Sequence, residues 1–333
     1  MKNAFKIFLI GCFALVAGLI AQKFGGDAEG LQLAGLTTVA LPIKNSIAEK
    51  EMLKELRHEH TWAGEIKSKQ GWVNQDTIKI PKRGAAPKVL VNNKQYPIVK
   101  NGRDDSHIIL SLNKFDTENT VVTEDELNAL PYDKLSDVQA QHRETLEDET
   151  MEYGLYGLAP DENDEDSNLF VIETTGADDG TGRKRLTSKD VRNLQTKMNK
   201  KAIAKKGRVL VLCDDHHNDL LDEDKNYNTQ YHNHKEGEVT FVYYGFKMYV
   251  DSTTPEYDNS LVKLPYDSLT TGRKASVIFH AGSTAKAVGT VKRFARPAEL
   301  DPENRENTVG FQLYHIIIAY GVEGSAAVVS GRA

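Results

Sequence analysis

The sequence is poor in cysteine and has no strong excess of charge. Its 333 residues contain two cysteines, Cys12 and Cys213, which lie far apart in the chain. This spacing excludes a disulfide framework and the paired cysteine ligands of a structural zinc site. Lys and Arg number 42 against 48 Asp and Glu, a net charge of -6. A balance this close to neutral gives no sign that the protein as a whole binds nucleic acid or a membrane surface.

Long hydrophobic runs are almost absent, with one exception at the N-terminus. Residues 7–21 form an apolar run after a lysine-bearing start. The run fits a secretory signal better than a membrane span, which needs ~20 apolar residues. The letters LIGC at residues 9–12 also resemble a lipoprotein processing site, although few apolar residues precede Cys12. Two interpretations stay open: an export or anchor signal, and an apolar arm that packs against something.

Beyond this run, the first half of the chain changes from a helical to a strand pattern. An amphipathic helix is predicted from Ser46, where Ser46 and Glu49 have capping-box spacing. From Trp62 to Phe115 the period is two, and the short runs TIKIP, KVLV, YPIV and HIILSLNKF are separated by turn residues. This pattern predicts a long β-hairpin excursion. Such an excursion cannot bury both of its faces alone, so we expect it to lie on a partner.

Two helices of opposite charge are predicted next. The first runs from about Asp133 to Leu158 and carries a narrow apolar stripe: Leu135, Val138, His142 and Leu146. The chain is acidic from Glu144 to Asp166 and basic from Lys184 to Lys206. The basic helix has Val191, Leu194, Met198 and Ile203 on its inner face and Gly207 as its stop. It lacks interleaved aromatic residues, so we interpret the two blocks as complementary patches on neighbouring copies rather than as a nucleic-acid site.

The remaining segments are mostly β. Strands are predicted at residues 169–174 and 208–212, a polar loop from there to about Glu238, a strand or hairpin at residues 238–250, and a terminal β block from Lys274. No internal repeat is present. The order of helices and strands places the chain in the α+β class.

The stretch CDDHH, with YHNH further on, is the strongest candidate for chemistry. A metal-dependent hydrolase would use Asp214, Asp215, His216, His232 and His234. Adjacent residues of an extended segment face opposite sides, however, and no known metal-ligand spacing is present. Nor do the glycine-rich residues 176–184 form a phosphate loop, or residues 280–289 a nucleophile elbow. We interpret the stretch as a solvated loop rim, and expect no catalytic, cofactor-binding or metal-binding residues.

In this order the elements resemble the major capsid proteins of tailed bacteriophages of the Hong Kong 97 type. The resemblance extends from about residue 45 to 333. It rests on these blocks: TIKIPKRGAAPKVLVNNKQYPIVKNGRDDSHIILSL, DKLSDVQAQHRETLEDETMEYGLYGLA, RLTSKDVRNLQTKM with GRVLVL, YYGFKMYVDSTTP, and KASVIFHAGSTAKAVGTV with FQLYHIIIAYGV. The apolar N-terminus departs from the family pattern. The lysine and asparagine that crosslink some family members have no match here.

The resemblance implies a Hong Kong 97-like α+β fold with five parts. These are an N-terminal arm (1–60), an extended β loop (61–118), a peripheral domain with a spine helix (119–185), an axial domain (186–270) and return strands (271–333). The implied function is a structural protein of an icosahedral shell, not an enzyme, with no cofactor. Expected partners are other copies in hexamers and pentamers, portal, scaffold and decoration proteins, and packaged double-stranded DNA, but no membrane. Its expected location is the virion, after assembly in the host cytoplasm. The alternatives are an exported or lipid-anchored β-rich surface protein and the metal-dependent hydrolase.

Overall fold

The computed structural model describes residues 60–74, 76–82, 84, 88–98, 100, 102–125, 134–232, 242–301, 303–320 and 324–333. Contacts divide the chain into two units, Met1–Arg57 and His58–Ala333, and all described residues lie in the second. The apolar N-terminal run and the helix predicted from Ser46 therefore fall outside the described residues.

A seven-stranded mixed sheet contains strands that are buried along their whole length. Its order is β10 (Val242–Tyr243), β11 (Phe246–Val250), β9 (Arg208–Leu212), β13 (Arg273–His280), β16 (Ala326–Val329) and β7 (Phe170–Glu173), with β12 (Glu256–Tyr257) paired to β13. Strand β9 is parallel to β11 and antiparallel to β13. All five residues of β9 are buried, because helices cover both faces of the sheet. A strand covered on both faces has a continuous apolar sequence, as RVLVL does.

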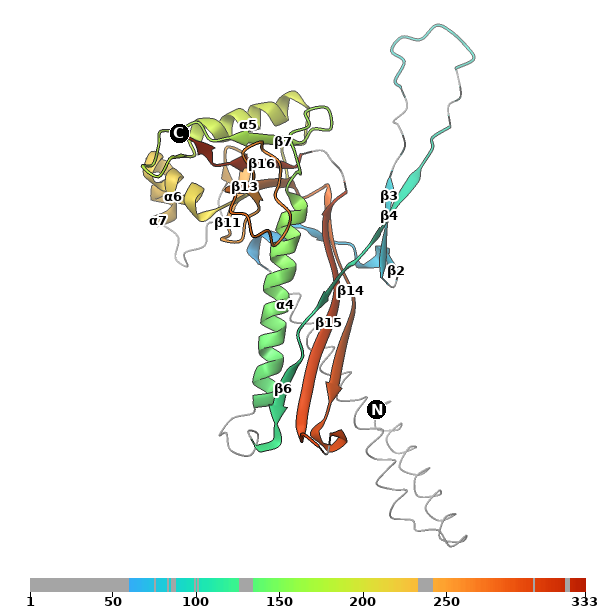
Figure 1. Cartoon of the computed structure of the whole chain (residues 1–333). Coiled ribbons are helices and arrows are strands. Elements are labelled where there is room, and N and C mark those ends of the chain that lie inside the picture. The colour runs from blue at the N-terminus through green and yellow to red at the C-terminus, as the bar shows by residue number, and fades with distance from the viewer. Residues whose placement is uncertain are drawn as a thin grey trace. The chain divides into compact units, whose positions relative to one another are not determined.

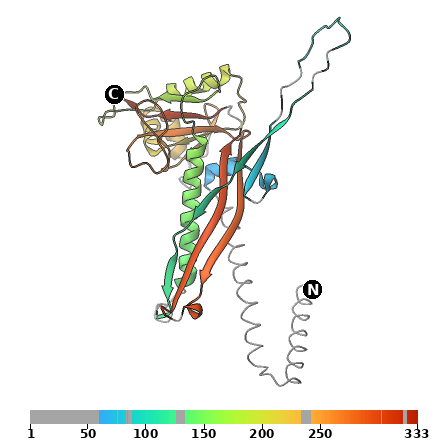
Figure 2. The same cartoon turned by 45° about the vertical axis from the view of Figure 1, so that its right-hand side comes forward.

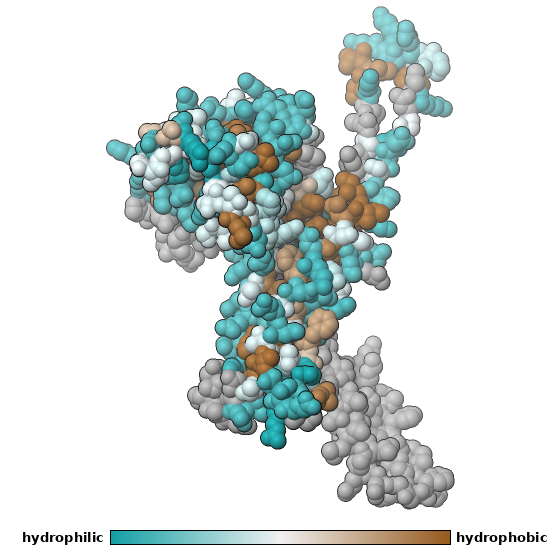
Figure 3. Space-filling view, viewed as in Figure 1, coloured by the Kyte–Doolittle hydropathy of each residue, from teal (hydrophilic) through white to brown (hydrophobic). Residues whose placement is uncertain are grey.

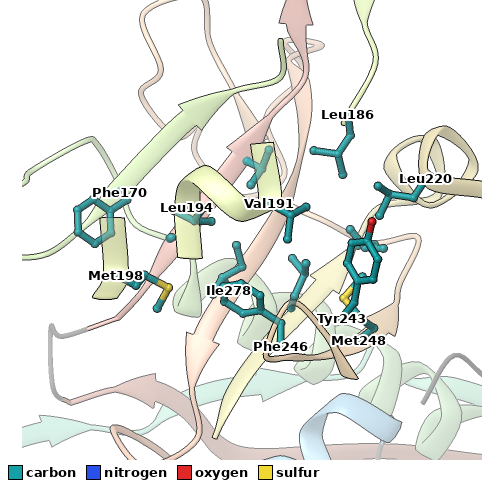
Figure 4. Close-up of a cluster of buried hydrophobic side chains, with 14 of the residues drawn as sticks. Phe170, Leu186, Val191, Leu194, Met198, Leu220, Tyr243, Phe246, Met248 and Ile278 are labelled. Atoms are coloured by element: carbon teal, nitrogen blue, oxygen red, sulfur yellow. The ribbon is translucent and has the colours of Figure 1, made fainter. Parts of the chain in front are cut away.

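The two faces of this sheet build two separate cores. On one face, Leu210 and Leu212 pack with residues of α5 (Ser188–Lys200), α6 (Asp214–Glu223) and α7 (Lys225–His232), as Figure 4 shows in part. On the other face, Val209 and Val211 pack against 3-10 helix η1 (Thr61–Glu65) and the last turns of α4 (Lys134–Leu158). Successive side chains of a strand alternate between faces, so β9 joins both cores.

A second sheet lies along α4. Its main strands, β14 (Thr284–Arg296) and β15 (Glu306–Ala319), form a long antiparallel hairpin. Strands β5 (Asn113–Asp116) and β6 (Thr120–Thr123) pair with β15, and β1 (Lys67–Ser68) pairs with β14. Figures 1 and 2 show α4 running beside this hairpin. A Cβ on Gly154 would lie 2.6 Å from Ile317 Cδ1. The glycine in α4 therefore allows the helix to approach β15 closely at this position.

Helix α4 confirms the prediction of a long helix with a thin apolar stripe. Val138, His142 and Leu146 are buried at intervals of four residues, and the stripe continues through Met151 and Leu155. These positions form one face of a helix. The other positions are exposed or partly exposed and include all six acidic residues of the helix, because only one face of α4 meets the sheet.

A three-stranded sheet carries the predicted excursion. It consists of β2 (Val73–Asn74), β3 (Thr77–Lys82) and β4 (Ser106–Ser111), all antiparallel. Ile78 and Ile80 are fully buried and pack against Ile316 of β15, so the base of the excursion belongs to the body of the protein. Between β3 and β4 the chain continues as a long loop, which is prominent in Figure 1. The predicted strands KVLV and YPIV are wrong: the described residues of both runs form no strand.

Two further predictions are corrected. The expected polar loop after residue 212 is largely helical, because α6 and α7 follow β9 directly. Asp214 and Asp215 occupy the first turn of α6, where acidic residues favour a helix start. The basic helix is shorter than predicted: α5 ends at Lys200, and Gly207 with φ +91° precedes β9 instead of capping the helix. Short elements complete the fold: η2 (Gln70–Trp72), η3 (Ala298–Leu300), β8 (Arg183–Lys184) and β17 (Gly331–Arg332).

Candidate functional site

The candidate chemical stretch contains a buried histidine. Cys213 directly follows β9 and is the N-cap of α6, which places His216 inside the molecule, with no exposed area. Its Nδ1 lies 2.7 Å from Ser276 Oγ and its Nε2 lies 3.0 Å from Ser330 Oγ. Burial lowers the pKa of His216 to about 4, so the ring is neutral at ordinary pH. Burial raises the pKa of the Cys213 thiol to about 11, which makes it a poor nucleophile.

A buried ion pair fixes the same helix to the neighbouring β8 strand. The Arg183 guanidinium donates to both Asp219 carboxylate oxygens, at 2.7 and 2.9 Å. The Leu186 backbone N–H donates to the same carboxylate at 2.8 Å. Hydrogen bonds to Asp219 raise the pKa of Arg183. Asp219 thus accepts three hydrogen bonds that hold α6 against the segment after β8.

The five residues of the hydrolase hypothesis are not brought together. Asp214 and Asp215 are exposed, whereas His216 is internal. The side chains of His232 and His234 fall outside the described residues. Among the residues that the structure describes, no group of three or more His, Cys, Asp or Glu side chains could hold a metal ion.

The solvated-rim interpretation is also wrong, for the two histidines of α6. His216 and His217 are both buried. The Nδ1 of His217 lies 2.8 Å from the Tyr227 hydroxyl on α7. Both histidines therefore serve the packing of helices on the sheet, and neither faces a ligand site.

The loop between β3 and β4 has the opposite character, because it exposes large apolar side chains. Val89 is 87% exposed, Val91 81% and Tyr96 76%, and Leu90 and Ile98 are more than half exposed. Figure 3 shows hydrophobic residues in brown at the end of this loop. Monomeric proteins rarely leave a large apolar cluster in water, so such a cluster marks an interaction surface. We call residues 88–98 the loop tip.

The extended loop is also basic, whereas α4 is acidic. Lys and Arg outnumber Asp and Glu by seven to two between residues 77 and 105. Along α4 the ratio reverses, with six acidic residues and two basic ones. The predicted pairing of an acidic block with the basic helix α5 occurs in part within one chain, where Lys197 Nζ lies 3.1 Å from Glu165 Oε1. A contact of these blocks between copies stays a prediction.

A pocket beside α4 is a feature that the sequence pattern does not predict. Residues 251–272 looked like a plain connector, yet together with Glu152 and Tyr156 they line a pocket of about 250 Å³. The repeated acidic and tyrosine residues of PEYD and LPYD were the available signal. Their spacing in the sequence does not indicate a binding site, because the pocket forms only when this segment folds against α4.

Comparison with solved structures identifies the fold as that of the Hong Kong 97-like capsid proteins. The mature capsid of bacteriophage PhiM1 superposes with a TM-score of 0.55 at 12% identity, over 81% of this chain and 87% of the other. For the capsid of Ralstonia phage GP4 the TM-score is 0.56 at 8% identity, over 81% and 87%. A virus-like particle from Pyrococcus furiosus gives 0.52 at 10%, over 86% and 99%. The resemblance and the α+β fold class predicted from the sequence are confirmed.

Comparisons based on sequence add no relative. No protein-family model matches the chain, and neither does any curated protein. No helix of the described residues is long and apolar enough to cross a bilayer, and the apolar run at residues 7–21 is outside that part of the chain.

Proposed function

We propose that this chain is a major capsid protein, which self-assembles into the icosahedral shell of a tailed double-stranded DNA bacteriophage. The observation that carries the proposal is the fold, which matches phage capsid subunits over about four fifths of the chain. The exposed loop tip supports it independently, since a surface of this kind needs a partner. In a closed shell, identical copies supply that partner.

The contacts of such a shell are individually weak and collectively strong. Burying one exposed valine or leucine of the loop tip contributes at most ~1.5–3 kcal/mol. Ordering the loop opposes part of this gain. Each subunit repeats the contact with its neighbours, so closure of the shell multiplies a modest term. Weak single contacts also allow misplaced subunits to dissociate during assembly.

The five parts implied by the resemblance apply to this chain as a proposal. The β2–β4 sheet and its loop lie within the extended β loop (61–118), and α4 lies within the peripheral domain with the spine helix (119–185). Helices α5 to α7 lie within the axial domain (186–270). The return strands (271–333) serve both sheets: β13 and β16 join the seven-stranded sheet, while β14 and β15 form the long hairpin. The N-terminal arm (1–60) falls almost entirely outside the described residues.

The proposed role needs no catalysis and no cofactor. The buried His216 and Cys213 act in packing, which agrees with a structural protein. The partners are other copies in hexamers and pentamers, together with portal, scaffold and decoration proteins and packaged double-stranded DNA bound without sequence specificity. The location is the virion, after assembly in the host cytoplasm.

Expression of the full chain tests the proposal. We expect particles that sediment far faster than a 37.1 kDa subunit and appear as closed shells in negative-stain electron microscopy. If assembly requires a scaffold protein, co-expression with the neighbouring genes of its source will supply it. A protein that stays monomeric at high concentration in both experiments contradicts the proposal.

Replacement of the loop tip provides the matched variant. Residues 88–98 exchanged for a Gly–Ser linker of equal length should give a folded subunit without shells, because the tip is outside the described cores. The control keeps the tip and substitutes Lys79→Ser at an exposed position of β3. Intact shells from the linker variant would show that the tip does not hold the copies together.

A further inference from the structure

The pocket beside α4 is acidic and aromatic. Glu152 and Tyr156 of α4 line one part of it, and Glu256, Tyr266 and Asp267 line another. The Tyr156 and Tyr266 rings lie 5.5 Å apart, edge to face. Carboxylates next to tyrosine rings form an environment that suits a cationic side chain.

Glu152 has no cationic partner in this pocket. It is half-buried, and no hydrogen bond or ion pair joins it to another described residue. Burial, followed by the charges of Glu149, Asp251 and Asp267, raises the pKa of Glu152. Lys263 contacts the Tyr156 ring, but its ammonium already binds Asp161 at 2.6 Å and two backbone carbonyls. A partly desolvated carboxylate among like charges is unfavourable unless a cation compensates for it.

A second polar group of the pocket is also unpartnered. Thr254 is 9% exposed, and its Oγ1 has no hydrogen-bond partner among the described residues. Buried hydroxyl groups are nearly always hydrogen-bonded in folded proteins. Neighbouring Glu149, in contrast, accepts a hydrogen bond from the Tyr266 hydroxyl at 2.6 Å. The pocket is therefore lined by one unpaired acid, and its wall contains one buried hydroxyl without a partner among the described residues.

The extended loop offers the complementary chemistry. Lys88, Lys94 and Lys100 are exposed and take part in no hydrogen bond or ion pair with other described residues. Lys94 lies within the loop tip, between Val91 and Tyr96. Next to the pocket, Leu269 is completely exposed and Val262 is 42% exposed. A lysine flanked by apolar residues thus matches an acidic pocket flanked by apolar residues.

We propose that this pocket is a docking site for the extended loop of a second copy of the chain, with the Lys94 ammonium placed against Glu152. The inference rests on the proposed shell function and specifies one contact within it. The lysine stem lies against the exposed side of the tyrosine rings, and the apolar residues of the tip cover Leu269. A charge pair of this kind contributes to the register between copies as well as to affinity.

Charge reversal tests the contact. Glu152→Lys should reduce the yield of shells by at least about tenfold, since a pair partly shielded from water is replaced by repulsion. Lys94→Glu alone should have a similar effect. The double variant, Glu152→Lys with Lys94→Glu, should restore the yield to within about threefold of the native protein, because the attraction is re-formed with reversed sign.

Controls separate this contact from folding and from general charge effects. Glu144→Lys places the same change on an exposed position of α4 outside the pocket, and Lys79→Glu does so on β3. Both should assemble normally. Thermal unfolding of the unassembled subunits should be alike for all variants, and Glu152→Gln, which keeps the shape of the side chain, should be intermediate in assembly.

The outcomes distinguish this inference from the proposed function. Normal shells from Glu152→Lys overturn the docking site while leaving the capsid function intact. Loss of shells without restoration by Lys94→Glu shows that another group occupies the pocket, which also overturns the inference. Failure of the native chain to form shells under any condition contradicts the proposed function itself.

Discussion

Two segments of this chain have nearly the same sequence and opposite environments. Residues 88–91 read KVLV and residues 208–211 read RVLV. Val209, Leu210 and Val211 are at most 1% exposed, in the centre of a sheet covered on both faces. Val89, Leu90 and Val91 are 87%, 56% and 81% exposed, in a loop without strand pairing.

The difference shows that one apolar pattern can serve two purposes. The apolar side chains of β9 are buried by other parts of the same chain, because α5 packs on one face of the strand and α4 on the other. In the loop tip no described residue of the chain covers it. The first segment stabilises the subunit, and under the proposed function the second stabilises the contact between subunits. Matched substitutions in the two segments separate these roles.

The largest effect is expected at β9. Val211→Asp places a carboxylate between η1, α4 and the sheet, where nothing can pair with it. We expect a loss of about 4 kcal/mol or more in the free energy of unfolding, which abolishes the folded subunit. Circular dichroism and soluble yield measure this. A folded, soluble Val211→Asp subunit would show that the two-faced core is much looser than the burial of β9 indicates.

The matched change in the loop is Val91→Asp. We expect the free energy of unfolding of the unassembled subunit to change by less than about 0.5 kcal/mol, because Val91 is already in water. Shells should be lost, since the carboxylate would have to be buried between copies. Urea unfolding measures the first effect and sedimentation the second. If Val91→Asp destabilises the isolated subunit as strongly as Val211→Asp does, the contrast between the segments fails.

Removing an ion pair should also lower the free energy of unfolding more in the body of the protein than in the extended loop. Asp219→Asn leaves the Arg183 guanidinium, whose side chain is 21% exposed, without its bidentate partner. We expect a loss of about 2 kcal/mol in the free energy of unfolding, because the hydrogen bonds to a charged group are lost while Asp179 still pairs with Arg183. The comparison variant in the loop is Asp105→Asn, where both partners are about half exposed, and the expected loss is at most about 1 kcal/mol. Urea denaturation of both variants provides the comparison, and equal losses would contradict it.

The stability of the unassembled subunit should also depend on pH. Burial lowers the pKa of His216 and of His315 to about 4, against about 6.5 for an unfolded histidine. The unfolded chain therefore binds more protons, and stability is lost as pH falls from about 6.5 toward 4. Each histidine contributes a slope of up to about 1.4 kcal/mol per pH unit. Urea unfolding between pH 6.5 and 5.5 measures the slope.

Two variants sharpen this measurement. The Val91→Asp subunit should have the same slope as the native subunit, because both histidines belong to the body of the protein. His315→Gln should reduce the slope, since the proton that His315 takes up on unfolding is no longer bound. A native subunit whose stability does not change over this range would show that the two rings are more accessible than their burial indicates.

Much of the fold could be predicted from the sequence. The period of α4, the buried run of β9 and the hairpin residues around Tyr244 and Gly245 all have local patterns, and the structure confirms these elements. The order of the blocks was sufficient to suggest the fold family. Local patterns failed at residues 214–232, where dense Asp and Asn favoured a loop. Helices α6 and α7 form there because Leu220 and Tyr227 pack onto the sheet, an interaction that no local pattern contains.

The candidate site was less predictable. The local sequence of a histidine next to aspartates does not distinguish a metal ligand from a buried residue. The hydrogen-bond partners of His216, Ser276 and Ser330, are far away in the sequence. The pocket at Glu152 depends on a connector that folds back against α4. The pKa of Glu152 is raised by burial and by neighbouring carboxylates, and both causes exist only in the folded chain.

The sequence by itself determined the elements whose stability is local: the long helix, the apolar strands, the turns between them, and the surplus of basic residues in the loop. The tertiary structure decided which apolar run is inside and which is outside, because burial depends on segments distant in the chain. KVLV and RVLV have the same intrinsic preference for a strand. Only the folded chain supplies neighbours for one of them and leaves the other exposed.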